Sequence, residues 1–342
     1  MAYTTIDNPE LYFQAKLYTG SGSSGNAITL DGDENMQPDW VWLKSRSDTE
    51  QHTVWDSVRG GAKRLMADAS NAEYDNSTQG LQSFDSDGFT CGASDQYNKS
   101  SQSVVAWNWK AGGSASSNTN GSINSSVSVN TTAGFSIVSW THDGGNSTIG
   151  HGLGAIPQVV ITKERNNSGS WNSYFKYVGN GYRMVLQGSN AKISSSIWNS
   201  TTPTANVFSM NDSITSTMIA YCFTEKKGYS KFGGYTGNAD TNFGPFIYTG
   251  FRPALVIIKN TSGNNWGMLD NKRDPHNGMQ TRLHPNLTNA DNTGAGIVID
   301  FLSNGFKCRS NDGLENGAAD ILYMAFAESP FVNSNGVPNN AR

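Results

Sequence analysis

The sequence predicts an all-β protein made of three tandem, related antiparallel β-sandwich units of a jelly-roll-like type. Three observations support this prediction. Charged residues make up only 15% of the 342 residues and aromatic residues 11%, while Gly, Ser, Asn and Thr, which favour turns over helix interiors, fill many other positions. Short apolar runs alternate with turn signals, and no segment of helical length shows a 3.6-residue apolar period. A set of three sequence anchors also recurs along the chain.

The first anchor is a proline followed by an apolar run that ends in a lysine six positions later. This run is typical of a strand with little solvent exposure, and proline suits the start of a strand because it lacks a backbone donor. If the copies are related, Val41, Val160 and Val256 should occupy the same environment. The three copies are Pro38–Lys44, Pro157–Lys163 and Pro253–Lys259.

The other two anchors are a tryptophan after the lysine and an apolar strand that closes each copy. We interpret the tryptophans as core residues, because each unit must fill the same interior. Strand, Asp-Gly or Asn-Gly turn, strand signals also occur at 84–89 and 301–306, and 207–212 is a remnant of the same hairpin. The tryptophans are Trp55, Trp171 and Trp266, and the closing strands are Val104–Trp109, Met218–Phe223 and Leu322–Phe326.

The anchors place the units at residues 15–113, 114–228 and 229–342, after an N-terminal arm of residues 1–14. The polar segment at 111–132 is either a flexible linker or a long loop. The units are either separate domains or parts of one pseudo-threefold body, and the arm docks either on a neighbouring chain or on its own domain. The sequence does not separate these alternatives.

Few residues stand at the spacing of a known catalytic, phosphate-binding or metal-binding motif. The histidines lie in no metal-binding or catalytic motif, and the chain has no G-x-S-x-G or phosphate-binding pattern. The segment Asp31–Asn35 gathers possible calcium ligands, but it lacks the EF-hand pattern and is interpreted as an acidic turn. We predict no catalytic, cofactor-binding or metal-binding residues, and the ligand-binding residues remain unassigned. Trp198, in a polar loop outside the repeat, is the better candidate for a surface contact. The histidines are His52, His142, His151, His276 and His284.

Cysteine usage and charge limit the possible partners. Cys91, Cys222 and Cys308 are few and far apart, so we expect small buried hydrophobes rather than disulfides, in a protein made in a reducing cytoplasm. The net charge of -4 and the lack of a basic cluster argue against nucleic acid. Neither a membrane span nor a secretory signal is expected.

Segments near both ends of the chain resemble a known group of proteins. The group comprises repeat-containing virion proteins of marine bacteriophages, such as those that infect cyanobacteria and SAR11-type bacteria, and similar segments occur in proteins described as tail-fibre or structural. The resemblance implies a virion surface protein, but it supplies no functional residues. The segments are Asp7–Gly20, Ile28–Gly32, Met36–Lys44, Ala327–Val332, Gly336–Pro338 and Ala341–Arg342.

From these observations we expect a non-enzymatic structural protein of the bacteriophage virion, assembled in the host cytoplasm. The first hypothesis is a tail-fibre or host-attachment component that contacts a host surface glycan or protein. The alternative is a capsid decoration or head-fibre protein that stabilises or coats the particle. Other virion proteins are expected partners, and a homo-oligomer, with a trimer favoured, is expected because symmetric assemblies are the default. A depolymerase is the remaining, disfavoured alternative.

Overall fold

Antiparallel β-sheet makes up nearly all of the regular structure, and the prediction of an all-β fold is confirmed. The computed structural model describes residues 2–293, 296 and 298–340. Within these residues, helical structure is confined to the 3-10 turn η1 (Pro9–Leu11) and the short helix α1 (Asp95–Asn98). No helix in this part of the chain is long and apolar enough to cross a membrane.

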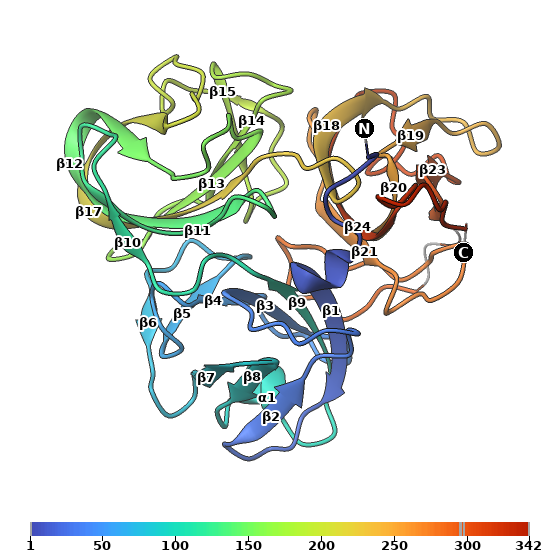
Figure 1. Cartoon of the computed structure of the whole chain (residues 1–342), viewed down its shortest axis with the longest axis horizontal. Helices are drawn as coiled ribbons and strands as arrows, with labels where there is room; N and C mark the ends of the chain where they lie inside the picture. The colour runs from blue at the N-terminus through green and yellow to red at the C-terminus, as the bar shows by residue number, and fades with distance from the viewer. Residues whose placement is uncertain (1, 294–295, 297, 341–342) are drawn as a thin grey trace.

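The strands are gathered into three modules around a common centre (Figure 1). We call residues 13–109 the first module, 116–223 the second module and 230–330 the third module. The first contains β1 (Phe13–Thr19), β2 (Asn26–Thr29), β3 (Trp40–Ser45), β4 (Thr53–Asp56), β5 (Lys63–Met66), β6 (Tyr74–Asp75), β7 (Leu81–Asp85), β8 (Gly88–Cys91) and β9 (Ser103–Trp109). The second contains β10 (Ser116–Asn118), β11 (Ser125–Asn130), β12 (Phe135–Gly150), β13 (Val159–Glu164), β14 (Asn172–Phe175), β15 (Tyr182–Val185), β16 (Ile193–Ser194) and β17 (Val207–Phe223). The third contains β18 (Ser230–Thr236), β19 (Phe246–Tyr248), β20 (Phe251–Asn260), β21 (Trp266–Asp270), β22 (Ile299–Leu302), β23 (Gly305–Cys308) and β24 (Asp320–Pro330).

Four neighbouring strands of each module follow one order and one register. The orders are β1-β9-β3-β4, β12-β17-β13-β14 and β18-β24-β20-β21. The anchor valine pairs with the closing strand on one side and with the next strand on the other, and all three valines are completely buried. The sequence anchor therefore marks one structural position. Val41 pairs with Asn108 and Trp55, Val160 with Cys222 and Tyr174, and Val256 with Ala325 and Leu269.

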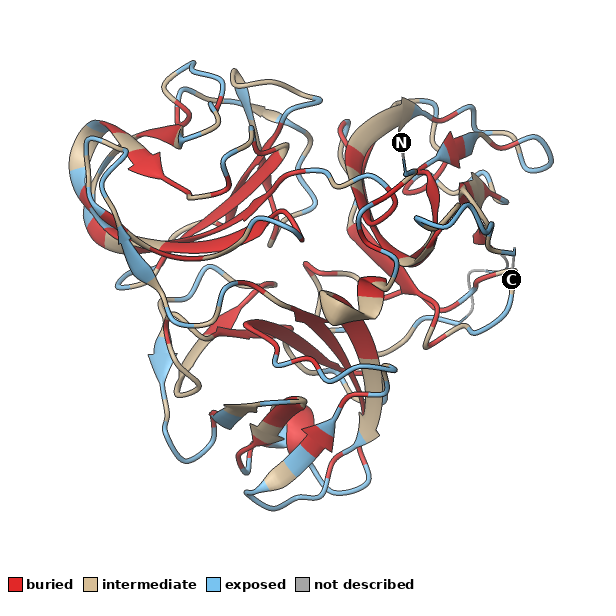
Figure 2. Ribbon diagram, viewed as in Figure 1, coloured by how far each residue is buried: buried red, intermediate tan, exposed pale blue. Residues whose placement is uncertain are grey.

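The first anchor strand is buried on both faces, which explains its continuous apolar sequence. In β3, Trp40 and Trp42 join the apolar cluster at the centre of the molecule. Val41 and Leu43 join a second cluster, which lies between this sheet and the outer sheet β2-β8-β7. Figure 2 shows burial concentrated in the strands around the centre, with exposed loops at the periphery.

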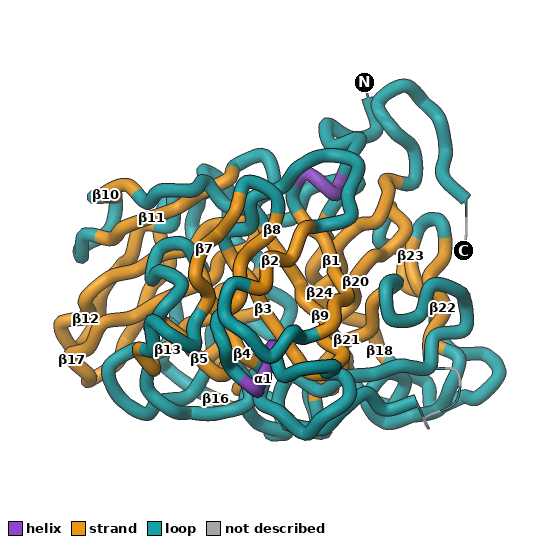
Figure 3. The backbone as a smooth tube through the Cα atoms, turned by 90° about the horizontal axis from the view of Figure 1, so that it is seen from below, coloured by secondary structure: helices purple, strands orange, loops and turns teal. Residues whose placement is uncertain are grey.

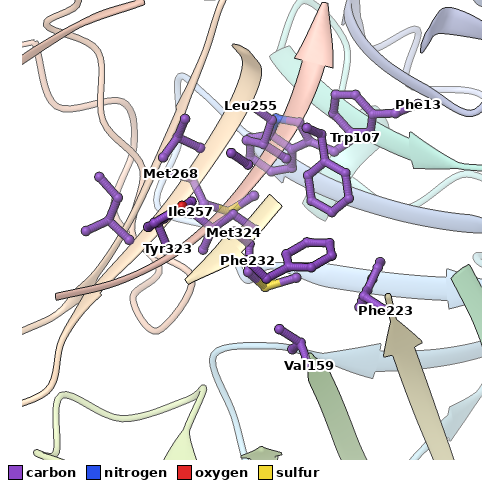
Figure 4. Packing of buried hydrophobic residues seen from close by; sticks show 14 of the residues in the cluster. Phe13, Trp107, Val159, Phe223, Phe232, Leu255, Ile257, Met268, Tyr323 and Met324 are labelled. Atoms are coloured by element: carbon purple, nitrogen blue, oxygen red, sulfur yellow. The ribbon is translucent and has the colours of Figure 1, made fainter. Parts of the chain in front are cut away.

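Among the aromatic side chains that the closing strands bring to the shared centre, one stands at an equivalent position in all three modules. Trp109, Phe223 and Phe326 occupy the same register position of their modules. The ring centroid of Phe326 lies 5.5 Å from that of Trp109 and 5.8 Å from that of Phe223. Figure 4 shows part of this cluster, to which all three modules contribute buried side chains. The modules therefore share one core, as in a single pseudo-threefold body.

Three matching backbone hydrogen bonds connect the modules in a ring. Each runs from the amide N–H of one module to a carbonyl just after the anchor lysine of the next, and the third bond returns from the third module to the first. The contacts between modules are therefore cyclic rather than linear. The bonds run from Glu73 to Arg165 (2.7 Å), from Lys192 to Thr261 (2.8 Å) and from Asp291 to Arg46 (2.9 Å).

The tryptophan anchor is equivalent in only two modules, so that part of the repeat prediction is wrong. Trp266 lies beside the anchor lysine of its module, and Trp171 occupies the matching position. The first module has His52 there, whereas Trp55 pairs with Val41 three residues further along the strand. The tryptophans therefore follow the anchor lysine at similar distances in the sequence, but they occupy two different positions in the sheets.

The two equivalent tryptophans each reach the neighbouring module. The indole Nε1 of Trp171 donates to the carbonyl of Met66 at 2.8 Å, and that of Trp266 donates to the carbonyl of Val185 at 3.0 Å. Both rings are buried. These side chains join modules as well as filling cores.

The second module departs from the sequence expectation at residues 207–212. Its strand β12 contains a bulge, where Gly144 and Gly145 have φ of 82° and 95°. The expected hairpin remnant at 207–212 is the first part of the 17-residue strand β17, which pairs with β12 on both sides of the bulge. The glycines allow this bend because they lack Cβ atoms.

The polar segment at 111–132 is part of the sheet rather than a flexible linker or a structureless loop. It holds the whole of β10 and β11, and β11 pairs with β12 from Ser125 to Asn130. Its small polar side chains suit an edge position, where one side of the strand meets solvent.

The N-terminal arm lies on the third module of its own chain. The hydroxyl of Tyr3 donates to the carbonyl of Gly250 at 2.9 Å, and that of Thr4 donates to the carbonyl of Lys227 at 2.7 Å. Figure 3 shows both chain ends projecting together from one side of the molecule. The arm ends before Phe13, where β1 begins, slightly earlier than the expected boundary.

Candidate functional site

Trp198 is a core residue, and its predicted role as a surface contact is wrong. Its side chain is 2% exposed, and its Nε1 donates to the carbonyl of Tyr182 at 3.0 Å. The ring packs edge-on against Tyr174, with centroids 5.9 Å apart. The polar neighbours that suggested exposure form a loop that folds over the outer cluster of the second module, and Trp198 points inward from it.

The histidines and the acidic turn do not come together as a site. The rings of His142, His151 and His284 each lie within hydrogen-bond distance of a backbone carbonyl, and His276 is exposed. Asp31 lies on the surface and pairs with Lys16. In the part of the chain that the structure describes, no group of three or more His, Cys, Asp or Glu side chains has a metal-binding arrangement.

The lysine that ends each anchor is buried in all three modules. Burial lowers the pKa of Lys44, Lys163 and Lys259 to about 8 in each case. Their ammonium groups donate to backbone carbonyls, as Lys163 does to Glu164 at 2.6 Å. Because the carbonyls belong to the end of the anchor strand, to the loop that follows it or, for Lys259, to Ser189 of the second module, we assign these lysines a structural role.

An arginine that the sequence reading missed occupies one position in all three modules. Arg64, Arg183 and Arg282 each stand directly before an apolar residue that pairs with the fourth shared strand. A sequence signal exists, because the arginine follows the anchor lysine by twenty residues in the first two modules and by twenty-three in the third. In each side chain, Nε is buried without a hydrogen-bond partner among the described residues.

Arg64 has no carboxylate partner among the described residues. Its Nη1 donates to the amide oxygen of Gln96, and its Cζ lies 5.0 Å from the ring centroid of Tyr74. Burial lowers the pKa of the Arg64 guanidinium, and the nearby hydroxyls of Tyr97 and Tyr74 offset this only in part. A partly buried positive charge is therefore balanced only by neutral groups.

Arg282, in contrast, is neutralised within its own module. Its guanidinium pairs with Glu315 and Asp312, and Glu315 is completely buried. Burial works to lower the pKa of Arg282, but the two carboxylates outweigh it and raise the pKa. The position in the third module is thus already filled by acidic side chains.

Arg183 shows a third arrangement. Its Nη1 donates to the side-chain oxygen of Asn172 at 2.8 Å. It lines a cleft of about 150 Å³ together with the carboxylate residues Glu164 and Asp212. This cleft is therefore less suited to an anion than the one at Arg64.

The cleft at Arg64 is open and lined mainly by polar groups. Its volume is about 270 Å³, near the lower end of ordinary ligand sites. Arg64 supplies a planar fork of donors, which suits a carboxylate or phosphate, and Tyr74 supplies a ring that is 48% exposed. The lining residues are Arg64, Tyr74, Gln79, Ala93, Ser94, Asp95 and Gln96.

A second cleft, of about 320 Å³, lies between the arm and the third module. Lys227 lies over the ring of Tyr3 at 4.4 Å, and Lys231 lies over that of Tyr248 at 5.3 Å. The two tyrosine hydroxyls are hydrogen-bonded to each other at 3.0 Å. Because these groups already satisfy one another, we take the cleft at Arg64 as the candidate site.

Fold and clefts together define an all-β protein of antiparallel modules with an open, mainly polar cleft in the first module. Residues 8–330 match the model of a family described as a domain of unknown function, DUF7483. The match covers most of the chain, and the protein belongs to this family. Neither a curated protein nor a solved structure matches the chain.

Proposed function

We propose that the protein is a surface component of a bacteriophage particle that takes part in host attachment, as a tail-fibre component does. The observation that carries the proposal is the open cleft at Arg64 and Tyr74, which presents an unbalanced charge and an exposed ring. Loops and clefts on a rigid β frame are typical of recognition proteins. The resemblance of both chain ends to virion proteins of marine phages points in the same direction.

The proposed role is binding, not catalysis. In the attachment model, the partner is a glycan or protein of the host surface, and other virion proteins hold the chain on the particle. The predicted trimer stays a prediction, and light scattering of the purified chain tests it. Release of reducing sugar from host polysaccharide would instead support the depolymerase alternative.

Two measurements test the attachment role. Antibody labelling of intact particles should place the chain on the tail, and the labelled purified protein should adhere to host cells. Arg64→Gln should weaken this adhesion, whereas Arg183→Gln should leave it unchanged because the cleft at Arg183 already contains the carboxylates of Glu164 and Asp212. Absence of the chain from the particle, or equal adhesion of both variants and the parent protein, would contradict the proposal.

Capsid decoration is the second candidate, and the ring of three modules favours it. A body with internal pseudo-threefold symmetry matches the local threefold positions of an icosahedral shell. Labelling of the head and a copy number that follows the capsid lattice would support this alternative. Labelling of the tail, with the low copy number of an appendage, would exclude it.

A further inference from the structure

The loop that faces Arg64 in the first module has a close counterpart in the third module. Asn98 donates from Nδ2 to the carbonyls of Ser23 and Gly92, both at 2.8 Å, and its side-chain oxygen accepts from the amide of Ser21. Asn316 makes the same set of bonds, to the carbonyls of Asp240 and Ser310 and from the amide of Asn238. The amides of Asn98 and Asn316 also donate to the carbonyls four residues earlier, those of Ser94 and Asp312, at 2.8 Å each.

This correspondence identifies what stands opposite the arginine in each module. Ser94 matches Asp312, and Tyr97, one residue before Asn98, matches Glu315. Both carboxylates that pair with Arg282 are thus replaced by uncharged residues in the first module. The guanidinium is retained while its acidic partners are absent.

The first module shows one consequence of this replacement. The guanidinium of Arg64 has no ion-pair partner among the described residues, whereas that of Arg282 pairs with two carboxylates. Nε is buried without a hydrogen-bond partner in both side chains, so the difference lies in the ion pairs. Leu314 is almost completely buried in the third module, whereas Gln96, at the matching position of the first module, lines the cleft of about 270 Å³.

We propose that the cleft at Arg64 binds an acidic sugar, with the sugar carboxylate taking the place beside Arg64 that Asp312 fills beside Arg282. Arginine forms bidentate hydrogen bonds with carboxylates, and the geometry within the third module shows that this position accepts one. The remaining lining suits sugar hydroxyls, because Gln79, Asp95 and Gln96 offer both donors and acceptors. The exposed ring of Tyr74 provides an apolar surface for a sugar face.

A carboxylate-bearing sugar fits these groups better than a phosphate does. Asp95 lines the same cleft and would repel a second negative charge, whereas it accepts hydrogen bonds from neutral hydroxyls. The inference deepens the proposed attachment function and rests on it for its biological setting. Binding itself is measured on the purified full chain, without cells or particles.

The first experiment compares ligands by NMR titration or calorimetry of the full-length protein. D-glucuronate should bind saturably, and D-glucose, which has the same ring without the carboxylate, should bind at least about tenfold more weakly, since a hydrogen bond to a charged group contributes about that factor. Acetate should also bind more weakly. Equal binding of glucuronate and glucose, equal binding of glucuronate and acetate, or tighter binding of a glutamate-containing peptide would overturn the proposal.

The second experiment uses variants whose folding is checked by circular dichroism. Arg64→Gln should lower the affinity for glucuronate about tenfold or more. Ser94→Asp, which restores one carboxylate of the third module, should do the same while the protein stays folded. Lys63→Gln changes a neighbouring, more exposed charge and should leave the affinity unchanged. Full affinity in both Arg64→Gln and Ser94→Asp would refute the assigned site.

The two proposals fail separately. If glucuronate binds as described but adhesion to host cells does not depend on Arg64, the attachment function is wrong and the ligand assignment stands. If adhesion depends on Arg64 but glucuronate does not bind, the reverse holds.

Discussion

Glu73→Gln should destabilise the protein strongly, because Glu73 pairs both with Arg59 of its own module and, across the module boundary, with Arg165 of the second module. Its carboxylate accepts from Arg165 at 2.8 and 2.9 Å and from Nη1 of Arg59 at 3.1 Å. Arg59 is completely buried, and Glu73 is only 10% exposed. The contact therefore lies in a region where solvent screens charges poorly.

The expected magnitude follows from what each arginine retains. Removing one partner of a buried ion pair costs about 3–5 kcal/mol. Arg59 keeps Asp56, which pairs with it at 2.5 Å, whereas Arg165 loses its only ion-pair partner among the described residues but is 19% exposed. We therefore expect a loss of about 2–3 kcal/mol for Glu73→Gln. Asp75→Asn is the matched control, because Asp75 is 60% exposed in its pair with Lys63 and should cost about 0–1 kcal/mol.

Urea denaturation at several pH values tests this reasoning. Burial works to raise the pKa of Glu73, but Arg165 and Arg59 outweigh it and hold the pKa below the ordinary value of 4.5. A carboxyl group of this kind stabilises the fold above its unfolded pKa, and the stabilisation is lost as pH falls through the folded pKa. The difference between parent and variant should therefore persist from neutral pH to about pH 5 and shrink below about pH 4. A loss no larger than that of Asp75→Asn, or a difference that grows on acidification, would refute the argument.

Three further predictions concern buried groups. Trp198→Ala should lower the free energy of unfolding by about 3–5 kcal/mol, and a loss under about 1 kcal/mol would contradict its core position. Burial holds the pKa of Lys163 at about 8 in the folded protein, against 10.5 in the unfolded chain. The stability of the parent relative to Lys163→Met should therefore rise by about 2 kcal/mol between about pH 8 and pH 10, and a flat difference in calorimetry would count against this. Burial raises the pKa of the thiols of Cys91, Cys222 and Cys308, so the native protein should react with a thiol reagent only after denaturation, and rapid labelling at neutral pH would disprove it.

The all-β class and the main strand anchor were predictable because they depend on local pattern. A strand buried on both faces must be apolar at consecutive positions, and the run from Pro253 to Lys259 has this pattern. The hairpins at 84–89 and 301–306 were predictable for the same reason, since a two-residue turn fixes the pairing of Phe84 with Phe89 and of Phe301 with Phe306. Each of these features is decided within a few residues of chain.

The errors arose where distant contacts decide the outcome. Trp55 and Trp171 have similar spacing from their anchors, but only Trp171 bonds to a neighbouring module, and no local pattern distinguishes them. Trp198 lies among polar residues and still fills a core, because the loop that carries it folds over the sheet. The closed ring is a property of contacts such as that from Asp291 to Arg46, which are far apart in the sequence.

The candidate site could be predicted only in part from the sequence. The recurrent arginine has a sequence signal, but its meaning depends on which residues face it. At Arg282 the facing residues are acidic and the position is structural, whereas at Arg64 they are Ser94 and Tyr97 and the charge is left unbalanced. Three copies of one module are therefore informative in a way that a single copy is not, because the copy that supplies its own carboxylates shows what the open copy lacks.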